Sequence, residues 1–157
     1  MVFPILFNLI VGFIIPWSIA ILVCRKVPIL FLTVAPFMSL LSVTLNQIGM
    51  EWGFWTLYPE ADLLIFNSIY IDFGYNPSAA ILFIYMIYVK KLKRYAVYLG
   101  FILFLNGAEI LAQHFEKVVY SNDWNIFYTF LAYVIGLIVL DLYYFLLTRS
   151  ISKRNLS

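Results

Sequence analysis

Two long uncharged stretches at the start of the chain constrain its fold more than any other feature. Met1 to Cys24 contains no Asp, Glu, Lys or Arg, and a second such stretch runs from Val27 to Met50. A helix needs roughly 20 predominantly apolar residues to cross the hydrocarbon core of a bilayer. Both stretches reach that length, so the sequence predicts a chain that enters a membrane.

The composition supports this prediction. Hydrophobic residues make up 64% of the chain and charged residues only 11%, whereas a soluble domain is roughly half apolar and about a quarter charged. A chain of 157 residues has too little interior to bury such an excess, but lipid can solvate it. The composition therefore excludes a soluble enzyme, and a net charge of +2 is too small to indicate nucleic acid as a partner.

The hydrophobic pattern predicts one all-α domain over residues 1–157, a polytopic membrane helix bundle with about five transmembrane helices. The expected spans cover residues 2–23, 28–48, 70–89, 95–115 and 126–148. The first is expected to be retained, because it lacks the basic residues that open a signal peptide. Polar and aromatic connections are expected before the third span and between the last two.

The third span has an unusual beginning. Its first half is polar, and we expect an irregular entry at 63–76 that is interfacial or re-entrant. Asn76 and Pro77 have the pattern of a helix N-cap followed by a first-turn proline. The sequence therefore predicts that the regular helix of this span begins there.

The basic residues predict the orientation of the bundle. Nine of the ten lie on one side of a five-span chain, and only Lys117 lies on the other. The nine are Arg25, Lys26, Lys90, Lys91, Lys93, Arg94, Arg149, Lys153 and Arg154. Basic loops stay in the cytoplasm, so we expect the N-terminus outside, the C-terminus inside, and a multi-pass protein of the plasma membrane.

Two acids fall inside predicted spans, Glu109 and Asp141. An ionisable side chain at this depth is costly and faces protein or water. At 1.5 Å per residue the two acids differ in depth by roughly 13 Å, so we treat them as separate sites. For Asp141 we favour a structural role, in which it pairs with an Arg or Lys from the basic side.

A polar stripe surrounds Glu109. Asn106, Glu109, Gln113 and Glu116 share one helical face that opens outward, and Asp72 is expected near the same level. The functional interpretation is an outward-facing polar vestibule that binds a cation, a proton or a small polar ligand. The structural alternative is that these side chains hydrogen-bond neighbouring helices, which we favour for Asn106 and Gln113 but not for Glu109.

The remaining motifs concern packing and metals. Ala108 with Ala112, and Ala132 with Gly136, form pairs of small residues at a spacing that lets helices approach closely, within the chain or with a partner. One histidine, His114, cannot supply the ligands of a zinc or di-iron site. We therefore expect no metal, no cofactor and no catalytic residue.

The second half of the chain resembles a family of small, uncharacterised, multi-span membrane proteins of spore-forming Gram-positive bacteria. The resemblance rests on the order and spacing of several elements over about residues 52 to 145. These are Trp55, Tyr58 and Pro59, then Asp72 and Pro77, the basic turn from Lys90 to Arg94, Glu109, and finally Tyr120 and Trp124. The resemblance implies a bacterial plasma membrane and no particular activity.

Three functions fit these observations. The first is a non-enzymatic accessory, assembly or sensing component that works through a membrane protein partner. The second is a small transporter or channel subunit, in which buried acids and a broken helix form the site and a homo-oligomer encloses the path. The third is a membrane-embedded enzyme with Glu109 or Asp72 as general base, which only the acids themselves support. We favour the first.

Overall fold

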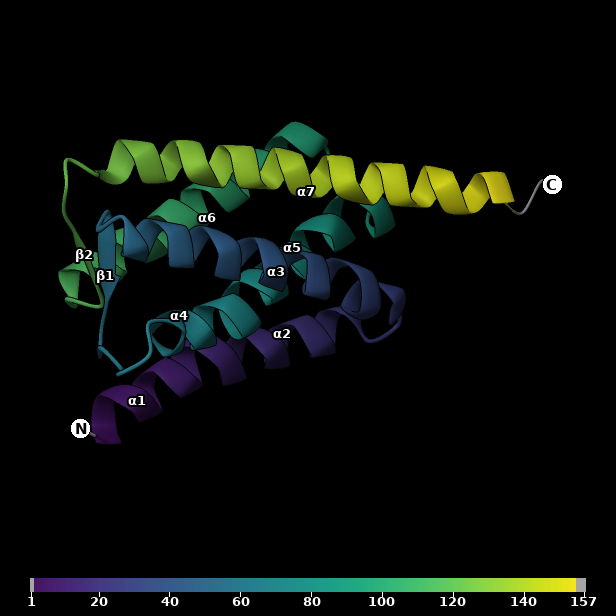
Figure 1. Cartoon of the computed structure of the whole chain (residues 1–157). Helices are drawn as coiled ribbons and strands as arrows, with labels where there is room; N and C mark the ends of the chain where they lie inside the picture. Colours follow the sequence, from purple (N-terminus) through teal and green to yellow (C-terminus); the bar gives the residue numbers. More distant parts are fainter. Residues whose placement is uncertain (1, 155–157) are drawn as a thin grey trace.

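The computed structural model describes residues 2–154 of the chain, and its side chains from Leu6 to Ile151. It is a helical bundle with one small sheet (Figure 1). Four helices are long and apolar enough to cross a membrane. The predicted helical bundle is therefore confirmed, with several helices of the length and composition that a membrane span needs.

The first two long helices lie where the uncharged stretches predict them. The first consists of α1 (Val2–Leu9), the π-helical turn η1 (Ile10–Ile14) and α2 (Ile15–Cys24) without a break, and the second is α3 (Ile29–Glu51). Pro16 has no amide hydrogen for the carbonyl of Gly12, four residues earlier. The wider turn η1 lies directly before this proline, which lets the helix continue past it.

The third helical segment differs from the prediction. It is continuous through α4 (Ile65–Tyr70), the π-helical turn η2 (Ile71–Tyr75), α5 (Asn76–Ile84) and the π-helical turn η3 (Tyr85–Val89). The helix start expected at Asn76 is therefore wrong, and the entry at 63–76 is helical from Ile65 onward. The π-helical turn before Pro77 accommodates its missing amide hydrogen without ending the helix.

The two π-helical turns η1 and η2 lie against each other. A Cβ atom on Gly74 would lie only 2.1 Å from the carbonyl oxygen of Gly12, so only glycine permits this approach. Beside them, the indole Nε1 of Trp17 donates to the carbonyl oxygen of Phe73 at 2.7 Å. Pro77 leaves that carbonyl without its usual helical donor, and Trp17 replaces it.

The last two helices are α6 (Arg94–His114) and α7 (Ile126–Arg154). The loops before the third segment and between α6 and α7 contain the strands β1 (Trp55–Leu57) and β2 (Val118–Tyr120). The strands are antiparallel, with Trp55 opposite Tyr120 and Leu57 opposite Val118. The polar and aromatic connections expected here therefore contain a sheet that the sequence did not predict.

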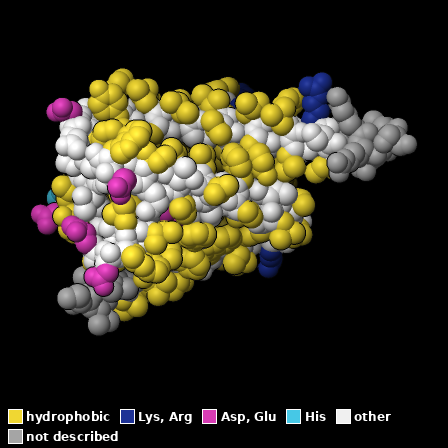
Figure 2. Space-filling model, in the orientation of Figure 1, with side chains coloured by type: hydrophobic (Ala, Val, Ile, Leu, Met, Phe, Trp, Pro, Cys, Tyr) yellow, Lys and Arg dark blue, Asp and Glu magenta, His cyan; other side chains and the backbone are white. Residues whose placement is uncertain are grey.

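The bundle has two different ends (Figure 1). We call the end that carries the N-terminus, β1 and β2 the strand end, and the opposite end, with residues 25–28 and 90–93, the basic end. Figure 2 shows acidic side chains gathered at the strand end and Lys or Arg toward the basic end. With 29 residues, α7 is about 43 Å long at 1.5 Å per residue and extends past the other helices at the basic end.

Helix α5 forms the centre of the bundle. It contacts α2, α3, α6 and α7, and its residues Ile81, Phe83 and Ile84 are completely buried. On the outer surface, large apolar side chains are exposed: Leu32 is 74% exposed and Leu40 is 70% exposed. An apolar exterior around a packed interior is the arrangement that a lipid environment stabilises.

Candidate functional site

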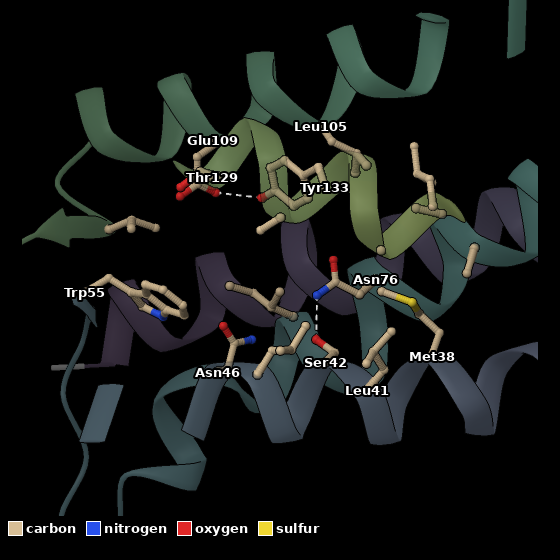
Figure 3. A pocket seen from close by; sticks show the side chains of 18 of the residues that line it. Met38, Leu41, Ser42, Asn46, Trp55, Asn76, Leu105, Glu109, Thr129 and Tyr133 are labelled. Carbon is tan, nitrogen blue, oxygen red and sulfur yellow. Dashed lines mark hydrogen bonds between the residues drawn. The ribbon is translucent and has the colours of Figure 1, made fainter. Parts of the chain in front are cut away.

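A cavity of about 160 Å³, which we call the chamber, lies among α3, α5, α6 and α7 toward the strand end (Figure 3). Much of its wall is aliphatic, and its polar groups gather on two facing sides. Its apolar lining includes Met38, Leu41, Leu45, Leu105, Leu137 and Leu140, its polar lining Ser42, Asn46, Asn76, Glu109, Thr129 and Tyr133, and its aromatic lining Trp55, Tyr120 and Trp124.

Glu109 of α6 stands on one of the polar walls. Its Oε1 accepts a hydrogen bond from the Tyr120 hydroxyl at 2.7 Å, and its Oε2 accepts one from the Tyr133 hydroxyl at 2.8 Å. These donors come from β2 and α7, so the carboxylate joins three elements. Among the residues that line the chamber, Glu109 is the one with an ionisable acidic or basic side chain.

A chain of donors leads to this carboxylate. Trp124 Nε1 lies 2.9 Å from Thr129 Oγ1, and Thr129 Oγ1 lies 2.7 Å from the Tyr120 hydroxyl. Since Tyr120 gives its only proton to Glu109, Thr129 must donate to Tyr120, and Trp124 donates to Thr129. Burial, and after it the charge of Glu109, raises the pKa of Tyr120, so this phenol remains a donor.

Asp72 lies behind the opposite wall and is completely buried. Its Oδ1 accepts hydrogen bonds from Ser42 Oγ at 2.5 Å and from Asn46 Nδ2 at 2.6 Å. Asn76 Nδ2 in turn donates to Ser42 Oγ at 2.6 Å, as Figure 3 shows. Ser42, Asn46 and Asn76 line the chamber, so Asp72 acts on it through these side chains.

Aromatic rings close the chamber at the strand end. The rings of Trp55 and Trp124 meet edge to face, with centroids 4.9 Å apart, and Phe54 stacks on Trp124 at 5.0 Å. The Trp55 indole lies directly on α3 at Gly49, where a Cβ atom would come within 2.0 Å of the ring. Glycine at this position therefore holds Trp55 in place.

On the side of the chamber toward the basic end, Phe37 of α3 stacks on Tyr143 of α7, with ring centroids 3.9 Å apart. The Tyr143 hydroxyl also donates to the carbonyl of Thr33 at 3.2 Å. Between this contact and the tryptophan pair, α7 presents Ala132 and Gly136 to the chamber. A Cβ atom on Gly136 would meet nothing within 4 Å, so this small pair leaves open space instead of the close helix contact that its spacing predicts.

Only some of the residues predicted to form the polar vestibule lie at the chamber. Glu109 lines the chamber and Asp72 supports its opposite wall, as described above. Asn106 instead donates to the carbonyl of Ile102 in its own helix at 2.9 Å. The Nε2 of Gln113 is buried without a partner among the described residues. Neither Asn106 nor Gln113 lines the chamber.

Asp141 belongs to a separate cluster toward the basic end. Its carboxylate forms an ion pair with Arg94 at 2.5 Å and accepts hydrogen bonds from Tyr88 at 2.7 Å and Tyr98 at 2.8 Å. The guanidinium of Arg94 also lies over the Tyr88 ring, 5.4 Å from its centroid. The basic partner expected for Asp141 is thus Arg94, and the cluster ties α7 to η3 and α6.

Several chamber residues were not identified from the sequence as site residues: Ser42, Asn76, Thr129 and Tyr133. A hydroxyl or amide within an apolar helix is a weak signal by itself, because such groups also bond their own backbone. Tyr133 lies 24 positions from Glu109 in the sequence, so only the fold shows that they meet.

The part of the chain that the structure describes contains no cluster of metal ligands. Among the residues that the structure describes, no three His, Cys, Asp or Glu side chains lie close enough together to hold an ion. The chemistry that the chamber offers is therefore that of one carboxylate, several hydroxyl and amide groups, and indole rings.

Comparison of the chain with protein-family models, with curated proteins and with solved structures finds no match.

Proposed function

We propose that the chain crosses the plasma membrane five times, with its N-terminus outside and its C-terminus in the cytoplasm. The helical segment from Ile65 to Val89, the third in chain order, supports a total of five spans. Its 25 residues measure about 37 Å at 1.5 Å per residue. Its buried polar residues, among them Asn67 and Asp72, lie inside the bundle instead of facing lipid. Charge also supports the orientation, since the basic end would be cytoplasmic.

We further propose that the protein is a non-enzymatic accessory or sensing component that binds a small ligand in the chamber from the outer half of the membrane. The observation that carries this proposal is Glu109, a carboxylate placed in a cavity whose wall is largely aliphatic and held at both oxygens by phenols from two other elements. A fixed polar group in a concave apolar site is the usual form of a ligand pocket.

The resemblance to small multi-span proteins of spore-forming bacteria agrees with this proposal. Trp55, Glu109, Tyr120 and Trp124 all line the chamber, and Asp72 supports its wall. Elements that are far apart in the sequence pattern therefore converge on one place. Membership of that family is a proposal that rests on these residues.

The proposed function is tested by Glu109→Gln, which keeps the size of the side chain and removes its charge. The control is Glu116→Gln, because Glu116 lies just past the end of the same helix and is exposed. We expect Glu109→Gln to fold but to fail to restore whatever phenotype deletion of the gene produces, whereas Glu116→Gln restores it. Full complementation by Glu109→Gln would contradict a function for the chamber.

The partner is tested by crosslinking and mild-detergent purification of the tagged protein. A second membrane protein recovered at fixed stoichiometry is the expected result for an accessory or sensing component. A homo-oligomer with nothing else bound would contradict it.

A transporter or channel subunit is the second candidate. One observation favours it: Asp72 Oδ2 is buried without a hydrogen-bond partner among the described residues, next to a π-helical turn, and such turns recur at functional sites. The packing argues against an open path, because the chamber ends on Leu137 and Leu140, and the bundle beyond them is packed core. The crosslinking experiment separates the two candidates.

A further inference from the structure

The wall that α3 and α7 contribute to the chamber is its exposed side. Leu45 lines the chamber and is 48% exposed, and Ala132 lines it from α7 and is also exposed. Gly136 adds no side chain on the same face. In a five-span bundle this side would face the bilayer.

The chemistry of the lining selects the charge of an occupant. Glu109 is the one charged group in the lining, and no basic side chain there balances it. Trp55 and Trp124 present indole rings at the strand end, and a cation over an indole face is attracted by the ring. A carboxylate beside aromatic rings binds a cation and repels an anion.

The size and polarity of the rest of the chamber select the shape of an occupant. A cavity of about 150 Å³ holds a molecule the size of benzene, and the chamber measures about 160 Å³. It therefore encloses a headgroup with a few methylene groups, and a longer chain must leave between α3 and α7. Aliphatic side chains such as Leu41 and Leu105 line that part of the chamber.

We infer, on the basis of the proposed function, that the chamber binds an amphipathic amine that enters from the bilayer. Its ammonium group lies between Glu109 and the Trp55–Trp124 pair. Its alkyl part lies against the aliphatic wall and passes between α3 and α7 beside Gly136.

The test uses the purified full chain in mild detergent and two probes of equal length, 3-bromopropylammonium and 3-bromopropanol, whose bromine stays close to the polar group and therefore to the tryptophan pair. Bromine quenches indole emission at short range, and Trp55 and Trp124 both line the chamber. We expect saturable quenching by the ammonium probe at concentrations about tenfold lower than for the alcohol, a difference of about 1.4 kcal/mol. Glu109→Gln should remove this preference, and Glu116→Gln should keep it.

The route of entry has its own matched pair of variants. Gly136→Leu should weaken quenching by both probes, whereas Gly107→Leu should not, because Gly107 also has open space around it but lies outside the lining. Quenching that Gly136→Leu leaves unchanged would overturn entry between α3 and α7.

Three other outcomes would overturn the inference: equal binding of the two probes, a preference that survives in Glu109→Gln, or no saturable quenching by either probe. Saturable binding of the neutral probe alone would leave the proposed ligand-binding function standing. Complementation by Glu109→Gln would remove the proposed function itself.

Discussion

At the scale of single residues, the π-helical turns show how the chain keeps prolines within long helices. Pro77 removes one backbone donor, and the indole of Trp17, from another helix, replaces it at the carbonyl of Phe73. Backbone groups inside a bundle need such partners, because water does not reach them. Gly12 and Gly74 complete the arrangement by bringing the two π-helical turns into backbone contact.

Trp17→Phe should therefore destabilise the protein by about 1–3 kcal/mol, the cost of leaving a backbone carbonyl of a membrane-spanning helix without a donor. An aromatic ring remains at this position, although it is smaller than the indole. Thermal unfolding in detergent measures the effect, with Trp52→Phe as control because Trp52 is 64% exposed. Equal losses in the two variants would show that the hydrogen bond contributes nothing.

Gly49→Ala should displace the Trp55 indole from α3, because the new methyl group would overlap the ring. Such overpacking costs about 1–3 kcal/mol. The expected signs are a lower unfolding temperature and a shift in tryptophan emission. Gly107→Ala is the control, since a Cβ atom there meets nothing within 4 Å. An unshifted emission spectrum in Gly49→Ala would contradict the close contact.

At the scale of elements, the Asp141 cluster connects α7 to α6 and η3. Asp141→Ala removes the acceptor for Arg94, Tyr88 and Tyr98 together. We expect a loss of about 2–4 kcal/mol, because hydrogen bonds to a charged group are stronger than neutral ones and two phenols lose their partner. Thermal unfolding measures the loss, and Asp62→Ala, at an exposed acid, should change stability by less than about 0.5 kcal/mol.

The long apolar helices could be predicted from the sequence because their length and lack of charge require a bilayer. The continuous segment through Pro77 could not, because Asn-Pro has the same pattern at a helix start as after a π-helical turn. The strands β1 and β2 also escaped prediction, since three β-prone residues in a loop pair only when the helices bring the loops together. Glu109 could be singled out from the sequence because an ionisable side chain is costly in lipid. Its partner Tyr133 could not, because only the fold brings the two side chains together.

At the scale of the whole molecule, the charge segregation seen in Figure 2 predicts which end meets the cytoplasm. The prediction is tested with single cysteines at Asn122 and Lys90, both exposed, in a Cys24→Ala background. A membrane-impermeant thiol reagent applied to intact cells should label the Asn122 site only. Labelling of the Lys90 site without permeabilisation would show that the orientation is reversed.

The aromatic contacts at the two ends of the chamber have a consequence for selectivity. Phe37, which stacks on Tyr143, and Gly49, which supports Trp55, are 12 residues apart on one helix, or about 18 Å at 1.5 Å per residue. These contacts bound the chamber at both ends along α3. If the chamber binds a ligand as proposed, it would select occupants by their length along the membrane normal.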